Sequence, residues 1–163
     1  MKLRHLFFAC SGVFVMMFSL LLLVVIVFSD EEDGGSDGNL IYGGVSVSQE
    51  VLAHKPMLEK YAREYGIEEY LNVLLAIIQV ESGGTLEDVM QSSESLGLPP
   101  NSLSTEESIK QGCKYFSELL AAAETKGCDL NSVIQSYNYG GGFLDYVAGR
   151  GKKYTFELAE SFA

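Results

Sequence analysis

Glu81 is the residue of this sequence whose type and position most clearly allow chemistry. It ends an apolar stretch that also contains Leu74, Ile77 and Ile78. On a helix these three positions lie on the same stripe as Glu81, within about 60° of it. Apolar neighbours disfavour the charged form of a carboxyl group, and the negative end of a helix dipole does the same. We therefore expect a raised pKa at Glu81 and a side chain that donates a proton near neutral pH.

The residues after Glu81 favour a reactive group over an ordinary solvated helix end. Gly83-Gly84 has no side chains and lets a ligand or a backbone segment approach closely. A polar segment over residues 88–95 follows directly. Small residues and polar groups beside a partly desolvated acid are typical of a binding site.

Histidine and cysteine do not indicate a second kind of site. The histidines are His5, next to an apolar N-terminal stretch, and His54, on a predicted helix surface. No cysteine has a histidine partner, so we expect no cysteine nucleophile, no metal site and no cofactor. A disulfide between Cys113 and Cys128 is not expected either, because the predicted helix between them separates the pair by about 20 Å, against the ~5.5 Å that a disulfide needs. Both are interpreted as small buried residues.

The strongest helical signal surrounds Glu81 itself. Residues 68–82 are predicted as a core helix, because nine of the eleven residues over 70–80 are apolar and burial on all sides is indicated. Before it, Ser48 is an N-cap residue for a helix over 49–65. Pro56 either kinks this helix or begins a second segment.

Capping signals predict further helices in the second half of the chain. Ser104-Thr105-Glu106-Glu107 is a capping box, and the apolar periodicity after it continues until Gly127. Asp129 caps a shorter helix that runs into a glycine-rich segment. Weaker helices are predicted over residues 143–147 and 155–162.

The remaining segments predict turns rather than strands. Residues 85–103 contain serines, Gly97 and Pro99-Pro100, which favour a loop-rich connector, with a short helix over 88–92 as an alternative. We expect no strand pair, since the only alternating run, 41–47, is short. The predicted fold class is therefore all-α.

An uncharged stretch over residues 6–28 predicts a transmembrane helix. Its 23 residues suffice to span the ~30 Å hydrocarbon layer. Basic residues before it and acidic residues after it place residues 1–5 in the cytosol and the rest outside. Residues 29–46 are acidic and glycine-rich, as in a flexible stalk, and residues 47–163 form the folded domain. A cleaved signal peptide is the alternative, although its apolar region is usually shorter.

The chain is acidic, with a formal net charge of −11 at pH 7. Its only basic cluster, Arg150, Lys152 and Lys153, is more typical of a solvated turn than of a binding patch. Nucleic acid is therefore not an expected partner.

Three short motifs occur in a fixed order: Glu81-Ser82-Gly83, Val89-Met90-Gln91 and Ser136-Tyr137-Asn138-Tyr139-Gly140. With this order on a helical background, the chain resembles the lysozyme-like family, which includes goose-type lysozymes and soluble lytic transglycosylases. The resemblance is strongest to a Gram-positive, membrane-anchored wall-lytic branch, whose members often carry an additional cysteine peptidase domain. It covers roughly residues 48–162 and implies a lysozyme-like globular helical domain. The ten-residue spacing from Glu81 to Gln91 looks shorter than in typical transglycosylases.

The resemblance also implies roles for individual residues. In the family the motif glutamate protonates the glycosidic oxygen, which assigns that role to Glu81. Gln91 would line the sugar cleft and Asn138 would contact an N-acetyl group, since an amide both donates and accepts hydrogen bonds. The tyrosines offer flat faces for sugar rings. The substrate-binding candidates are Ser82, Gln91, Ser92, Tyr137, Asn138 and Tyr139.

The identity of a second catalytic carboxylate decides between two reactions. Glycoside hydrolysis usually needs two carboxylates, about 5–5.5 Å or ~6.5–9.5 Å apart. Asp88 and Glu94 are the candidates. Without either, Glu81 acts alone, first as acid on the leaving oxygen and then as base on the muramyl 6-hydroxyl, which is the transglycosylase route that the family implies.

The resemblance implies a muramidase that cleaves the β-1,4 bond between N-acetylmuramic acid and N-acetylglucosamine in peptidoglycan. A lytic transglycosylase that forms 1,6-anhydromuramyl ends is the first alternative. A non-catalytic glycan-binding scaffold of a secretion complex is the second. By analogy with the branch, the domain would act outside the membrane in local wall remodelling for a conjugation apparatus.

Overall fold

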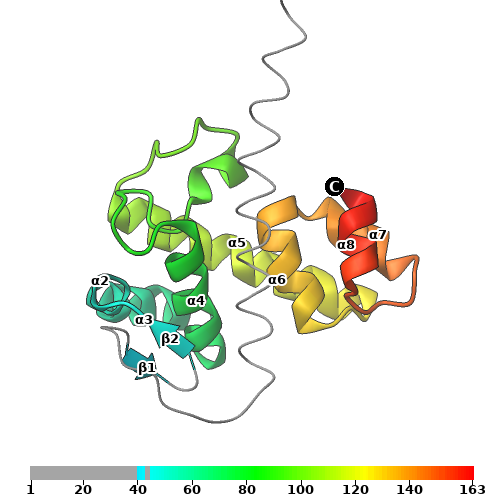
Figure 1. The fold of residues 1–163 in the computed structure, drawn as a ribbon, viewed down its shortest axis with the longest axis horizontal. Helices are drawn as coiled ribbons and strands as arrows, with labels where there is room; N and C mark the ends of the chain where they lie inside the picture. Colours follow the sequence, from blue (N-terminus) through cyan, green and yellow to red (C-terminus); the bar gives the residue numbers. More distant parts are fainter. Residues whose placement is uncertain (1–39, 43–44) are drawn as a thin grey trace, which may run out of the picture.

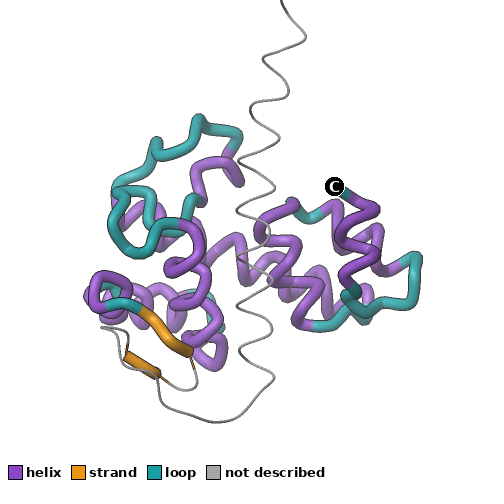
Figure 2. The backbone as a smooth tube through the Cα atoms, viewed as in Figure 1, coloured by secondary structure: helices purple, strands orange, loops and turns teal. Residues whose placement is uncertain are grey.

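The computed structural model describes residues 40–42 and 45–163, which form a largely helical domain (Figures 1 and 2). In these residues no helix is both long and apolar enough to cross a membrane. The predicted transmembrane segment 6–28 lies outside the described residues. In chain order the elements are β1 (Leu40–Tyr42), β2 (Val45–Val47), α2 (Gln49–Ala53), α3 (Lys55–Glu64), η1 (Glu68–Tyr70), α4 (Leu71–Glu81), η2 (Ser92–Leu96), α5 (Thr105–Lys126), α6 (Leu130–Tyr139), α7 (Gly142–Ala148) and α8 (Phe156–Phe162).

The domain begins with a strand pair, so the prediction that no strands pair is wrong. β1 and β2 are antiparallel, with Leu40 opposite Val47 and Tyr42 opposite Val45. Strands of three residues are too short for alternation to identify them, although Gly43-Gly44 between the two is a hairpin turn signal. Val47 is fully buried, so the end of the alternating run packs into the core.

The first predicted helix is divided at Pro56. Ser48 caps α2, its hydroxyl accepting the backbone N–H of Val51 at 3.3 Å. Pro56 then lies in the first turn of α3, where its missing N–H leaves no helical bond unmade. Of the two alternatives, Pro56 therefore begins a second segment.

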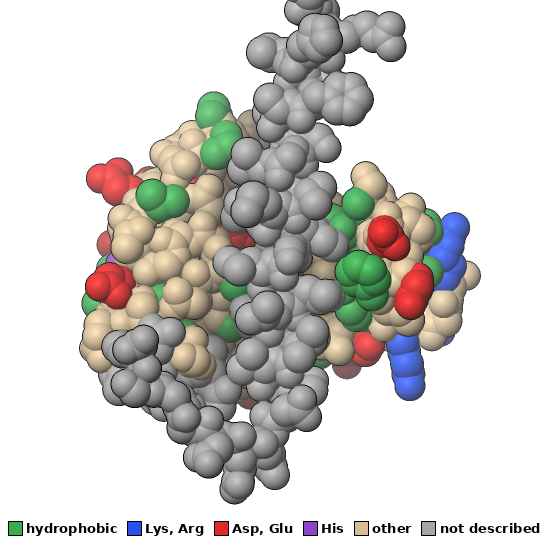
Figure 3. All heavy atoms as spheres, in the orientation of Figure 1, with side chains coloured by type: hydrophobic (Ala, Val, Ile, Leu, Met, Phe, Trp, Pro, Cys, Tyr) green, Lys and Arg blue, Asp and Glu red, His purple; other side chains and the backbone are tan. Residues whose placement is uncertain are grey.

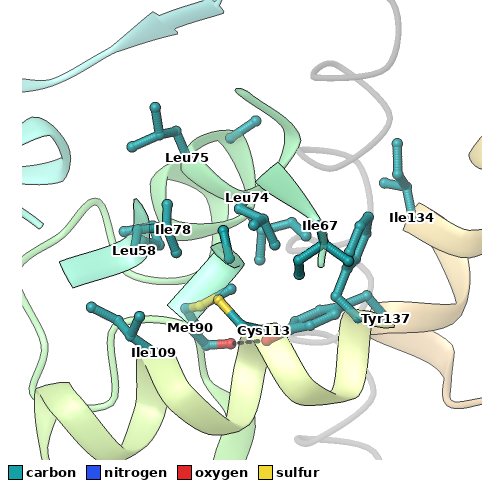
Figure 4. Packing of buried hydrophobic residues seen from close by; sticks show 14 of the residues in the cluster. Leu58, Ile67, Leu74, Leu75, Ile78, Met90, Ile109, Cys113, Ile134 and Tyr137 are labelled. Carbon is teal, nitrogen blue, oxygen red and sulfur yellow. Dashed lines mark hydrogen bonds between the residues drawn. The ribbon is translucent and has the colours of Figure 1, made fainter. Parts of the chain in front are cut away.

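The helix that carries Glu81 is the centre of the core, as predicted. Every residue from Leu74 to Ile78 is buried in α4. Their cluster extends from the strand pair to α6, and Figure 4 shows Leu74, Ile78 and their neighbours packed together. Each buried Leu or Ile contributes about 1.5–3 kcal/mol, which fixes the axis of α4 and with it the position of its last residue.

Helix α5 runs from one half of the domain to the other (Figure 1) and begins and ends where its caps predict. The Ser104–Glu107 capping box is formed, and Gly127 ends the helix in the left-handed conformation. Gly112 allows a close approach at its centre: a Cβ there would lie 2.6 Å from Met90 Sδ and 2.8 Å from Tyr137 Oη. α5 is therefore the element against which the connector and α6 are both positioned.

A smaller aromatic cluster holds the C-terminal helices together. Phe143, Val147 and Ala159 are its buried centre, surrounded by Tyr139, Tyr146, Tyr154 and Phe162. As predicted, the two cysteines in the described residues are free thiols. Cys113 is buried, while Cys128 is partly exposed rather than buried as expected.

Candidate active site

A cavity of about 350 Å³ opens between the end of α4, the connector and α6. Seven of the nine predicted site residues line it. They belong to the three sequence motifs or lie close to them in the sequence. Ser82 and Asp88 are the two that do not line it, and Ser95, Tyr115 and Gly140 line it without having been predicted. The complete lining is Glu81, Gln91, Ser92, Glu94, Ser95, Tyr115, Tyr137, Asn138, Tyr139 and Gly140.

Glu81 is the last residue of α4 and faces this cavity. The pKa of its carboxyl group is raised to about 8, chiefly by burial and in smaller part by the charges of Glu94 and Asp88. The predicted direction of the pKa shift is confirmed, and the carboxylates add a cause that the sequence did not reveal. A carboxyl group with this pKa is protonated at neutral pH and can donate a hydrogen bond or a proton to a bound molecule.

The turn after Glu81 is held by contacts with other segments of the protein. Ser82 Oγ donates to the Val89 carbonyl at 2.7 Å and accepts the Gly84 N–H at 3.0 Å. A Cβ on Gly84, whose φ is +78°, would lie 2.7 Å from the backbone of Glu50 and Val51. The glycine pair therefore allows α2 to approach the turn closely. Ser82 links the turn to the connector.

The residues that flank α2 secure the same turn from the other side. His54 Nε2 lies 2.9 Å from the Gly84 carbonyl, and Ser48 Oγ donates to the Gly83 carbonyl at 3.4 Å. Gln79 Oε1 accepts the backbone N–H of Ser48 at 2.7 Å. His54 is thus part of the support behind the turn.

Asp88 supports the connector from within. It is fully buried, and its carboxylate accepts the Ser92 N–H at 3.0 Å, the Ser93 N–H at 3.3 Å and the Ser108 hydroxyl at 2.6 Å. Ser108 also accepts the Met90 N–H at 3.0 Å. With its oxygens engaged in this way, Asp88 holds the connector in shape and does not face the cavity.

Gln91 and Glu94 reach the cavity from the connector. Gln91 has φ +47°, and its Nε2 donates to the Asp88 carbonyl and to Asn101 Oδ1, both at 2.8 Å. Its amide oxygen therefore remains as an acceptor. Glu94 is exposed in η2, the short 3-10 helix that forms just after the predicted 88–92 position.

Aromatic side chains form the opposite wall. Tyr137 is almost wholly buried, and its hydroxyl donates to the Met90 carbonyl at 3.1 Å, the dashed line in Figure 4. Tyr115 lies against it, with ring centroids 5.5 Å apart. Tyr139 packs on Phe143 with centroids 5.5 Å apart. Tyr137 thus joins the second motif to the third, while Tyr139 and the half-buried Asn138 line the cavity.

The lining residues that were not predicted differ in whether the sequence pattern pointed to them. Gly140 lies within the third motif and Ser95 ends the polar segment after Glu81, so both had a local signal. Tyr115 had none, because its position depends on the packing of α5 against α6. Within the described part of the chain, no three His, Cys, Asp or Glu residues are placed to hold a metal ion.

Comparison with known proteins gives consistent matches. A family model described as Lysozyme-like matches residues 48–163. The "Bifunctional muramidase/DL-endopeptidase CwlT" of Bacillus subtilis (strain 168) is 44% identical over 130 residues, which are 79% of this chain and 38% of that protein. The "Uncharacterized membrane protein YocA" of the same strain is 39% identical over 118 residues, which are 72% of this chain and 52% of that protein.

A solved structure shows the same relationship in three dimensions. It is from Staphylococcus aureus subsp. aureus Mu50, is described as similar to lipoprotein, and is 76% identical with a TM-score of 0.72. The match covers 72% of this chain and 40% of that one. The chain thus spans about two fifths of the length of this protein and of CwlT.

Proposed function

Because the chain belongs to the lysozyme-like family, we propose that residues 47–163 form a muramidase that cleaves the β-1,4 bond between N-acetylmuramic acid and N-acetylglucosamine in peptidoglycan. The observation that carries this proposal is Glu81, whose pKa of about 8 keeps a proton available inside a cavity at neutral pH. Cleavage of a glycosidic bond begins with that proton. The muramidase named in CwlT supports the choice of substrate.

Glu81 and Glu94 divide the two carboxyl roles in this proposal. Glu81 protonates the glycosidic oxygen as the bond to the muramyl carbon breaks. Glu94 lines the same cavity and raises the pKa of Glu81 through its charge. It is the better candidate than Asp88 for the carboxylate that acts on the sugar or on a water, since the oxygens of Asp88 are engaged within the connector.

The remaining lining residues would orient the glycan. Gln91 presents its amide oxygen to a sugar N–H or hydroxyl, because its nitrogen donates inside the protein. Asn138 can both donate to and accept from an acetamido group. Tyr139 and Tyr115 provide ring surfaces at the cavity wall. Ser92 directs its hydroxyl to the Ser108 carbonyl and acts on the shape of the wall rather than on the sugar.

Substitution of the acid tests the proposal. In Glu81→Gln the amide has nearly the same shape but no transferable proton, so release of muropeptides from purified walls should fall by about 100-fold or more. The matched control is Glu87→Gln, an exposed carboxylate in the same segment, which should leave release unchanged. Release by Glu81→Gln at the wild-type rate would remove Glu81 from the mechanism.

Lytic transglycosylase activity is the second candidate, favoured by one observation. A group with a pKa of about 8 can give up a proton and then take one back from a sugar hydroxyl in the same site. The product is then an anhydro sugar, one water lighter than the hydrolysis product. Mass spectrometry of the released muropeptides separates the two reactions, and wild-type protein that binds glycan without any release would indicate the scaffold instead.

We further propose that a helix over residues 6–28 anchors the domain on the outer side of the cell membrane. The support is the sequence of that segment and the relative named as a membrane protein. Tethered in this way, the domain would cut the wall locally, as a secretion or conjugation complex requires. Extraction of the full chain from membranes by detergent, but not by high salt, is the expected result.

A further inference from the structure

A second hollow lies on the face of α5 that is turned away from the active-site cavity. Its volume is about 510 Å³, and it is bordered by the turn from α3 to η1, the middle of α5 and the start of α6. Along α5, Leu120 and Glu124 line it, whereas Tyr115 lines the active-site cavity. At 100° per residue these two positions lie about 140° and 180° around the helix from Tyr115. We call this hollow the rear groove.

The lining of the rear groove combines aromatic and aliphatic side chains with polar groups. Tyr65, Tyr70, Leu120 and Leu130 supply ring and aliphatic surface, and Leu130 is 38% exposed. The ring of Tyr70 is held edge-on against Phe116, with centroids 5.7 Å apart. The groove is thus a preformed surface that could cover an aliphatic side chain from a partner.

The charged side chains that line the rear groove are acidic, while Lys126 and Lys152 lie near Cys128. Glu69 and Glu124 line it and are exposed, and none of the described residues that line it is a lysine or arginine. Burial raises the pKa of Tyr65, and Glu64 raises it further while Lys110 lowers it. The nearby cation Lys126 is bound to Asp145 at 2.6 Å.

We propose that the rear groove binds a basic amphipathic segment of a partner protein. The aliphatic stem of a lysine or arginine would lie on the tyrosine and leucine walls, and its charged end would reach Glu69 or Glu124. Anionic lipid or wall polymer is repelled by a chain of net charge −11 (Figure 3 shows acidic side chains on both halves).

The location of the rear groove suits a partner that recruits the domain while it works. None of the described residues lines both hollows, so a bound segment leaves the active-site cavity open to its substrate. Binding in the groove and cleavage in the cavity are therefore separable by substitution, and the inference stands whether or not the glycosidase activity is confirmed.

The test uses the full chain in detergent and an amidated peptide of lysine and leucine in helical order, with its glutamate–leucine counterpart as a comparison. Titration followed by calorimetry should show binding of the lysine peptide only. The double variant Glu69→Gln, Glu124→Gln should weaken this binding by about tenfold. The control, Glu157→Gln with Glu160→Gln on α8, changes the net charge equally at exposed positions and should bind as wild type does.

Cys128 gives an independent readout inside the rear groove. It lines the groove and is partly exposed, whereas Cys113 is buried, so alkylation followed by peptide mapping reports on Cys128 at its own site. The lysine peptide should slow alkylation of Cys128 by at least about threefold in wild type and in the control, but not in the groove variant. Equal weakening in both variants, no protection of Cys128, or no binding by wild type would each overturn the proposal.

Discussion

Glu81 owes its capacity as a proton donor to its surroundings rather than to its residue type. Burial is the main cause of its raised pKa of about 8, and the charges of Glu94 and Asp88 add to it. These two carboxylates act differently on the site: Asp88 is engaged with three donors in the protein, while Glu94 remains exposed at the cavity. A carboxyl group that holds its proton at neutral pH, with a second carboxyl group at the same cavity, is the arrangement that glycosidic cleavage uses.

The pH dependence of cleavage should follow the proton on Glu81. Cleavage is expected to persist at neutral pH and to fall as the pH rises through about 8, because the acid then loses its proton. Glu94→Gln removes a neighbouring negative charge, so the pKa of Glu81 should fall. The basic limb of any residual activity of this variant should therefore lie at lower pH than in the wild type. Muropeptide release measured across pH tests both expectations. A basic limb that does not move in the variant would contradict the electrostatic role of Glu94.

The same pKa shift should appear in the stability of the fold. The folded-state pKa of about 8 exceeds the model-compound value of 4.5, so the folded state holds this proton more tightly. The stabilisation that this proton gives the fold is fully present below a pH of about 4.5 and is lost as the pH rises through about 8. At pH 8 the free energy of unfolding of Glu81→Gln should therefore exceed that of the wild type by on the order of 3 kcal/mol. At pH 4 the two free energies should be alike. Urea unfolding at both values, with Glu87→Gln as control, measures this difference.

At the scale of elements, the connector depends on Asp88. In Asp88→Asn one of the acceptor oxygens becomes an NH₂ group that faces donors, so the free energy of unfolding should fall by about 2–3 kcal/mol. Asp145→Asn is the control, because its pair with Lys126 is exposed and should change stability by less than about 1 kcal/mol. Loss of cleavage without loss of stability in Asp88→Asn would instead identify Asp88 as the second catalytic carboxylate.

The turn that follows α4 depends on its contact with α2. Gly84→Ala places a Cβ 2.7 Å from the Glu50 and Val51 backbone at φ +78°, and should destabilise the fold by about 2–4 kcal/mol. Gly66→Ala is a close match, since its φ is +67° and a Cβ there meets nothing within 4 Å. It should lose only about 1–2 kcal/mol, the conformational penalty alone. Thermal unfolding of the two variants compares them, and equal losses would mean that the contact with α2 contributes nothing.

The helices and caps that were predicted correctly depend on local interactions. The Ser104–Glu107 box, the Asp129 cap and the apolar run in α4 act within one helical turn or one helix, and all three are found as predicted. Interactions between distant segments were not predictable in the same way. The inward carboxylate of Asp88 and the place of Tyr115 at the cavity each depend on contacts that residue spacing does not specify. The strand pair is local and was missed because its strands are only three residues long.

At the scale of the whole molecule, the active-site cavity exists because two parts of the chain close on α5. The connector contributes Gln91, and α6 contributes Tyr137 and Asn138. Both parts meet at Gly112, where Met90 and Tyr137 contact the helix and each other through the bond between the Tyr137 hydroxyl and the Met90 carbonyl. The shape of the cavity should therefore respond to the packing at this single point, although Gly112 itself does not line it.

Gly112→Ala tests this dependence. The added Cβ would lie 2.6 Å from Met90 Sδ and 2.8 Å from Tyr137 Oη, so the Met90 and Tyr137 side chains must shift. Overpacking of about 1–3 kcal/mol should exceed the roughly 1 kcal/mol that alanine gains over glycine in a helix. We expect a lower free energy of unfolding and weaker glycan binding, with the basic limb of the pH profile shifted because Glu81 is less buried. Thr125→Ala changes helix propensity on the exposed side of α5 and should leave glycan binding and the basic limb of the pH profile unchanged. If Gly112→Ala were more stable than wild type and bound glycan equally well, the two parts would not be coupled through α5.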